Sequence, residues 1–163
     1  ELNRCLHIFS PRDAGIREIS KPLDELISVS DINQIRRQSL PDDRRPPESI
    51  FGKEPEHGWC YFYEKAQLAS QYEDWSEVTR LLESAEVQGH SPGYAPELLP
   101  LLDAYLQLGR LQEAYRLSVR LARLSNNTDD PVCAIWQGVV ETQNTPQVEE
   151  AFNNVREKIS CFD

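Results

Sequence analysis

Apolar residues recur at steps of three and four along the later two thirds of the chain, and this pattern predicts amphipathic helices. The breaks between them contain residues that cap helices or tolerate left-handed backbone geometry. Three prolines fall in first helical turns, where the missing N–H costs little: Pro96, Pro131 and Pro146. The helices are expected at residues 57–72, 75–88, 95–108, 111–125, 131–142 and 146–160.

Residues 1–55 have a different pattern. They hold six of the eleven prolines, and proline removes a backbone donor and pushes the preceding residue towards extended geometry. We expect an extended piece over residues 2–9, one or two short helices such as residues 31–38, and a stiff connector over residues 40–55. The predicted organisation is thus an irregular N-terminal segment followed by a helical domain over residues 56–163.

The predicted helices repeat at a nearly constant spacing. An offset of 36 residues aligns residues 74–78 with residues 110–114, and the same offset aligns Ala85 with Leu121. A poorer third copy follows 34 residues later, around Val148. Because one helix pair cannot bury its apolar stripe alone, such repeats stack on their neighbours and share a core.

Small and large side chains divide the repeat as packed helix pairs require. Small residues let two backbones approach closely, and large ones fill the space around them. The small positions are Ala66, Ala69, Ala104 and Ala114, and the large ones are Phe62, Trp75, Leu82, Tyr105 and Tyr115.

The turn at residues 108–114, Leu-Gly-Arg-Leu-Gln-Glu-Ala, resembles the turn of a tetratricopeptide repeat. Gly109 would close the first helix there, and Ala114 would pack in the second. The earlier copy at residues 71–78 is similar but lacks the glycine. The resemblance implies an all-α fold of antiparallel helix hairpins, about three pairs, stacked as a short right-handed solenoid. The alternative is an irregular helical bundle with a chance periodicity.

In such stacks the first helices of successive pairs line a concave surface that binds a partner. The residues expected on that surface are Tyr63, Glu64, Gln67, Gln71, Asp103, Gln107, Gln137 and Glu141. A surface this rich in acids and amides suits a basic or polar extended peptide. The alternative is that these side chains are merely solvated helix surface.

The net charge of −10 argues against nucleic acid as a partner, since its binding needs clustered Lys and Arg. The basic pairs Arg36-Arg37 and Arg44-Arg45 lie beside Asp42 and Asp43, so we interpret them as solvated surface. The chain has no apolar run of about 18 residues, so no membrane span is expected within it. It contains no Met, which indicates a processed product or a fragment of a longer protein.

The stretch from Phe51 through His57 and Trp59 to Ala69 resembles a segment in the C-terminal soluble tails of certain bacterial multi-pass membrane proteins. Those proteins are related to dolichyl-phosphate-mannose mannosyltransferase-like and aminoarabinose-transferase-like glycosyltransferases. The resemblance implies the tail of a cell-membrane protein on the extracytoplasmic side, with a cytoplasmic location as the alternative. The partner would then be a protein, a peptide or the membrane-embedded part of the same chain. The tail could also brace a catalytic body or contribute to substrate binding. No catalytic residue carries over.

No pattern for chemistry stands out in this chain. The histidines at positions 7, 57 and 90 lack metal-ligand spacing, and no phosphate loop or nucleophile motif occurs. His57 and Trp59 form a candidate secondary site, although His57 is more simply a residue at a helix start. We therefore expect a binding module without catalytic residues, metal or cofactor.

The four cysteines are interpreted as small buried hydrophobic residues, because three of them adjoin apolar neighbours. Disulfides are the alternative in an oxidising compartment, and the spacing selects no pairing.

Overall fold

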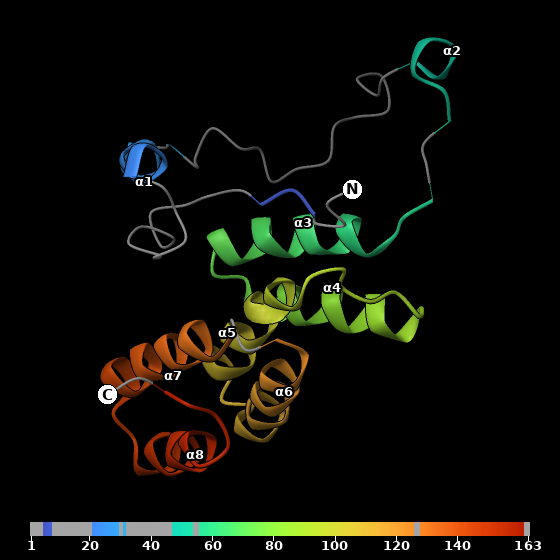
Figure 1. Ribbon diagram of the computed structural model, residues 1–163. Helices are drawn as coiled ribbons and strands as arrows, with labels where there is room; N and C mark the ends of the chain where they lie inside the picture. The colour runs from blue at the N-terminus through green and yellow to red at the C-terminus, as the bar shows by residue number, and fades with distance from the viewer. Residues whose placement is uncertain are drawn as a thin grey trace.

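A computed structural model describes residues 5–7, 21–29, 31, 47–53, 56–125 and 128–161 (Figure 1), and every regular element in these residues is helical. This confirms the predicted all-α class. Two short helices come first: α1 (Lys21–Ser28) and α2 (Glu48–Phe51). The others are α3 (Trp59–Gln71), α4 (Trp75–Val87), the 3-10 helix η4 (Ala95–Leu98), α5 (Leu99–Gln107), α6 (Leu111–Leu124), α7 (Asp129–Gln143) and α8 (Pro146–Arg156).

The predicted helix bounds agree with these elements to within a few residues. The clearest difference is the predicted helix over residues 95–108, which divides into η4 and α5 where Pro100 occupies the first turn of α5. Of the predicted helix over residues 31–38, only Asp31 lies in the described part of the chain. Of the expected extended piece over residues 2–9, residues 5–7 are described and are neither helix nor strand.

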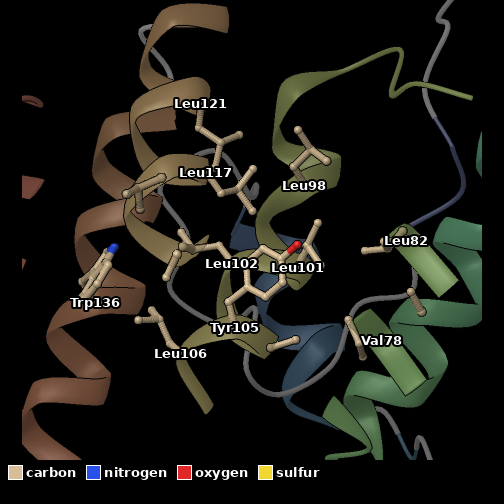
Figure 2. Packing of buried hydrophobic residues seen from close by; sticks show 14 of the residues in the cluster. Val78, Leu82, Leu98, Leu101, Leu102, Tyr105, Leu106, Leu117, Leu121 and Trp136 are labelled. Atoms are coloured by element: carbon tan, nitrogen blue, oxygen red, sulfur yellow. The ribbon is translucent and has the colours of Figure 1, made fainter. Parts of the chain in front are cut away.

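Helices α3 to α8 pack around one apolar core, with α5 at its centre (Figure 2). Each helix contacts the next one along the chain, and α3 also contacts α5, α5 contacts α7, and α6 contacts α8. Leu102 and Leu106 of α5 have no solvent exposure, and Leu101 is 1% exposed. Burial of a whole leucine side chain contributes roughly 1.5–3 kcal/mol, so α5 is the main apolar link between its neighbours.

The small residues predicted to sit at close helix contacts are all buried. Ala66, Ala104 and Ala114 have no exposure, and Ala69 is 3% exposed. Trp136 of α7 is also fully buried, and its indole Nε1 donates to the Ser118 hydroxyl of α6 at 2.9 Å. The Ser118 hydroxyl in turn donates to the carbonyl of Ala114, so this buried polar group is satisfied on both sides.

Two helix–helix turns share one backbone geometry 36 residues apart. Glu73 (φ 58°) follows α3, and Gly109 (φ 70°) follows α5. In each turn the backbone N–H of the left-handed residue, Glu73 or Gly109, donates to the carbonyl three residues back. The next N–H donates to the carbonyl five residues back, from Asp74 to Ala69 and from Arg110 to Tyr105. Glycine adopts this left-handed geometry without strain, whereas glutamate does so at a cost of about 1 kcal/mol.

Polar contacts join α4 to the second helix pair. Glu83 of α4 accepts a hydrogen bond from the Tyr105 hydroxyl at 3.0 Å and pairs with Arg110 at 2.9 Å, while Arg110 also pairs with Glu113. Burial raises the pKa of Tyr105 well above its usual value, and the bond to Glu83 raises it further. A separate ion pair at 2.6 Å joins Glu86 of α4 to Arg120 of α6.

The interpretation of the cysteines as free buried residues is wrong, because all four form disulfides. Cys5 bonds to Cys60 at the start of α3, and Cys133 of α7 bonds to Cys161 beyond α8. Cys60 is in fact exposed, so its apolar sequence neighbours, which lie on a different side of α3, misled the interpretation.

Side chains of α1 and α2 differ from those of the packed helices in their exposure. Leu26 of α1 and Ile50 and Phe51 of α2 are exposed, as is Val29 just after α1, whereas Ile27 of α1 is 2% exposed. Within the described residues, no helix has the length and apolar character needed to cross a membrane.

Candidate functional site

The candidate site is a surface groove of about 440 Å³ formed by three parts of the packed helices. The turn between α3 and α4 supplies one wall, α5 supplies the second, and one side of α7 supplies the third. We call this the open groove. Its lining residues are Glu73, Trp75, Asp103, Gln107, Ala134, Ile135, Gly138, Val139 and Thr142.

The open groove combines apolar and acidic side chains. Trp75 and Ile135, both partly exposed, provide apolar surface that can bury a partner's aliphatic side chain, while Val139 is 2% exposed and belongs to the core. Asp103 and Glu73 add carboxylates, and Gln107 donates a hydrogen bond to Asp103 at 3.1 Å. Such a site can hold an extended chain by apolar contact while the carboxylates attract a cationic side chain.

Gly138 keeps the open groove wide. A glycine inside a helix costs roughly 1 kcal/mol relative to alanine. No atom lies within 4 Å of the place where a β-carbon on Gly138 would stand, so helix packing does not require this glycine. The missing side chain lets another backbone come close to α7 at this point.

Four of the residues predicted to meet a partner lie on α5 and α7. Asp103 and Gln107 line the open groove. Gln137 and Glu141 do not line it; they are exposed on α7 and share a hydrogen bond of 3.0 Å. The structure therefore places Asp103 and Gln107 of α5 next to α7. The α7 residues that share the groove with them are not the predicted Gln137 and Glu141.

The other four predicted residues lie on α3, and two of them are covered. Tyr63 is 4% and Gln67 is 6% exposed, and both contact His7 of the N-terminal segment. Gln67 also donates to the Tyr63 hydroxyl at 2.7 Å. We call this side of α3 the covered face. Glu64 and Gln71 are partly buried.

The predicted secondary site at His57 and Trp59 is divided between surface and core. His57 is exposed and stacks on Tyr61, with ring centroids 3.5 Å apart. Trp59 is 7% exposed and belongs to the apolar core, so its indole is largely withdrawn from solvent. In the described residues, no three His, Cys, Asp or Glu side chains are grouped as metal ligands.

Sequence reasoning missed most of the apolar lining of the open groove. Ile135 and Val139 had been counted only as part of a helix, and Trp75 had been assigned to core filling. One signal was available: Gly138 interrupts an otherwise helical pattern, which often marks close packing or a functional contact.

Comparison with protein families, curated proteins and solved structures finds no match to this chain.

Proposed function

We propose that this chain is a protein-interaction module that holds a basic or polar extended peptide in the open groove. The observation that carries the proposal is the groove itself: the partly exposed apolar side chains of Trp75 and Ile135 line it together with Asp103. Apolar contact would supply affinity, and the carboxylates would select positive charge. The chain itself has no catalytic role in this proposal.

The arrangement of helices supports a tetratricopeptide-like stack. Contacts between α3 and α5, between α5 and α7, and between α6 and α8 are those expected when successive hairpins lie side by side. The matched turns at Glu73 and Gly109 repeat with the spacing found in the sequence. We interpret α3–α4, α5–α6 and α7–α8 as the three hairpins of a short right-handed solenoid.

The charge distribution supports a cationic partner. Residues 56–163 contain eight Lys and Arg and seventeen Asp and Glu, a formal charge of −9 out of the total of −10. A basic peptide would be steered towards this region, whereas phosphate backbones would be repelled.

The disulfides support a location on the extracytoplasmic side of a membrane. Disulfides persist in oxidising compartments and are rare in the reducing cytoplasm. Two of them join Cys5 to Cys60 and Cys133 to Cys161. We therefore propose that the chain is the soluble tail of a cell-membrane protein.

Peptide binding can be measured by fluorescence anisotropy with a labelled nonapeptide of alternating Arg and Val. A nonapeptide of alternating Glu and Val serves as the charge control. We expect the Arg peptide to bind and Asp103→Lys to weaken its affinity about tenfold or more, since an attractive charge becomes repulsive. Gly138→Trp should also abolish binding, because the indole would occupy the open groove.

The matched control is Glu150→Lys, which makes the same charge change at an exposed position of α8 outside the open groove. It should leave the affinity nearly unchanged. Equal weakening by Asp103→Lys and Glu150→Lys would show that only net charge matters. Equal binding of the Glu peptide would remove the charge argument.

A second candidate function is an accessory domain that braces the catalytic body of a membrane-bound glycosyltransferase or contributes to its substrate binding. The observation that favours it is the exposure of Ile50 (74%) and Phe51 (71%), which lie within the predicted connector over residues 40–55. Ile50→Ser with Phe51→Ser should release the tail from such a body in co-purification of the full-length protein. Val87→Ser, at an equally exposed site on α4, is the control and should not.

A further inference from the structure

A short non-helical segment, Cys5 to His7, lies against α3 on the covered face (Figure 1). The disulfide fixes Cys5 to the first turn of α3, and the backbone N–H of Cys5 donates to a carboxylate oxygen of Glu97 at 2.9 Å. His7 lies further along the helix, where it contacts Tyr63 and Gln67. The chain's own segment thus occupies part of the surface on which we predicted a partner.

Among the described residues, the disulfide is the strongest attachment of this segment. Leu6 is 68% exposed and His7 is exposed, so their side chains bury little apolar surface. The segment also makes polar contacts to Glu97, Tyr63 and Gln67, each contributing about 0.5–1.5 kcal/mol net. Without the disulfide, the segment would therefore detach far more readily.

The segment of residues 5–7 satisfies only one of the two carboxylate oxygens of Glu97. The Glu97 side chain is 3% exposed, and its Oε1 accepts from Cys5. Its Oε2 is buried and has no hydrogen-bond partner in the described part of the chain. A buried carboxylate oxygen without a donor is costly, and an arginine guanidinium is the group that donates to both oxygens at once.

We propose that the covered face is a second part of the peptide-binding surface, with residues 5–7 as its resident occupant. Reduction of the Cys5–Cys60 disulfide by a dithiol protein opens it to an arginine-containing extended peptide whose guanidinium binds Glu97. This inference rests on the proposed function, which it extends from the open groove to α3.

The reduction is an ordinary thiol–disulfide exchange. A thiolate of the dithiol attacks the sulfur of Cys60, an exposed residue, and Cys5 leaves as a thiolate that takes a proton from solvent. The second thiol of the reductant then displaces Cys60 and closes the reductant's own disulfide. In the other disulfide, Cys133 is 8% exposed and Cys161 is partly buried, so neither is as exposed as Cys60 and the bond offers less access to the same reagent.

Hydrogen exchange tests the opening step without any peptide. We compare the double variant Cys5→Ser/Cys60→Ser with Cys133→Ser/Cys161→Ser, which removes the same number of bonds. The amide of Cys5 donates to Glu97, so the residue-5 amide should exchange about tenfold faster in the first variant only. His7→Ala keeps both disulfides and should give a smaller acceleration. Unchanged exchange in Cys5→Ser/Cys60→Ser and in His7→Ala would overturn the proposal.

Binding of the Arg–Val nonapeptide tests the second step. Affinity should rise about tenfold in Cys5→Ser/Cys60→Ser, since one bidentate charged contact is added, and Glu97→Gln in that background should cancel the gain. Opening without any gain in affinity would also overturn the proposal. The open groove is tested separately, by binding to the oxidised protein and its loss in Asp103→Lys.

Discussion

The covered face of α3 and the open groove beside α5 involve residues 36 positions apart in the sequence, but one surface is occupied and the other is open. The offset of 36 residues places Gln67 over Asp103 and Gln71 over Gln107. Gln67 is buried against the chain's own His7, whereas Asp103 lines a groove of about 440 Å³. The same helical framework therefore supports one surface that is filled by its own chain and one that is open.

The difference arises from chemistry as well as position. On α3 a neutral amide and a phenol meet an imidazole, and a disulfide keeps the segment in place. On α5 a carboxylate takes the place of the amide, beside apolar residues of α7. An amide surface can be satisfied by an uncharged segment in cis, whereas the carboxylate of Asp103 favours a cation supplied by a partner.

The largest effect is expected from α5, which lines the open groove and packs against α3, the helix that carries the covered face. Leu102→Ala should lower the free energy of unfolding by about 2–5 kcal/mol, since Leu102 is fully buried in the core that α3 to α8 share. Val87→Ala, at a side chain 88% exposed, should change it by less than about 0.5 kcal/mol. Urea unfolding followed by circular dichroism measures both. A similar small loss for the two variants would contradict the central place given to α5.

A pair of tryptophan variants separates the core from the open groove. Trp136→Phe removes the indole N–H that donates to Ser118 in the core, and should cost about 1–3 kcal/mol. Trp75→Phe should cost less stability, because Trp75 is only partly buried, but should weaken peptide binding. Thermal unfolding and fluorescence anisotropy together test this division. If Trp136→Phe weakened binding while leaving stability unchanged, the assignment of the two residues would be reversed.

Substitutions at the left-handed residues of the two matched turns, Glu73 and Gly109, should change the free energy of unfolding in opposite directions. Gly109→Ala should lower the unfolding free energy by about 1 kcal/mol, because alanine is strained at φ 70°. Glu73→Gly should raise it by up to about 1 kcal/mol, since glycine is relaxed at that left-handed position. Urea midpoints measured side by side give the two signs. Destabilisation by Glu73→Gly would mean that the contacts of the Glu73 side chain outweigh its backbone strain.

The periodic part of the sequence was the most predictable part of the structure. Apolar periodicity located α3 to α8 because it directly reflects which side of each helix is buried. The small alanines at helix contacts were predictable for the same reason. Both follow from local packing, which depends on neighbours a few residues away along each helix.

The candidate site was less predictable because it depends on distant parts of the chain. Gln67 looks solvated in the sequence, but it is 6% exposed and contacts His7, which is 60 positions away in the chain. The disulfides also join residues separated by 55 and 28 positions, for which the local pattern has no signal. The open groove likewise requires α5 and α7 to lie side by side, which periodicity alone does not state.

The smallest expected effect is on stability, and it concerns how the helix after each matched turn begins, at Asp74 and at Arg110. Asp74 caps α4 by accepting from the Glu77 amide, whereas the equivalent residue before α6, Arg110, pairs with Glu113 instead. The pKa of Glu113 is lowered, because its carboxylate accepts from its own backbone N–H and from Arg110. A lowered carboxyl pKa stabilises the fold above the unfolded pKa, near 4.3, and this contribution is lost as the pH falls through the folded value.

Glu113→Gln should therefore be slightly less stable than the parent protein at pH 7, and the difference should shrink as the pH drops below about 4. Urea midpoints across this range measure the convergence. The difference should also shrink in high salt, since both partners of the Arg110–Glu113 pair are more than a third exposed. A difference that stays constant from pH 7 to pH 3 would show that Glu113 acts through helix propensity or packing, and that its ion pair with Arg110 does not distinguish the two turns.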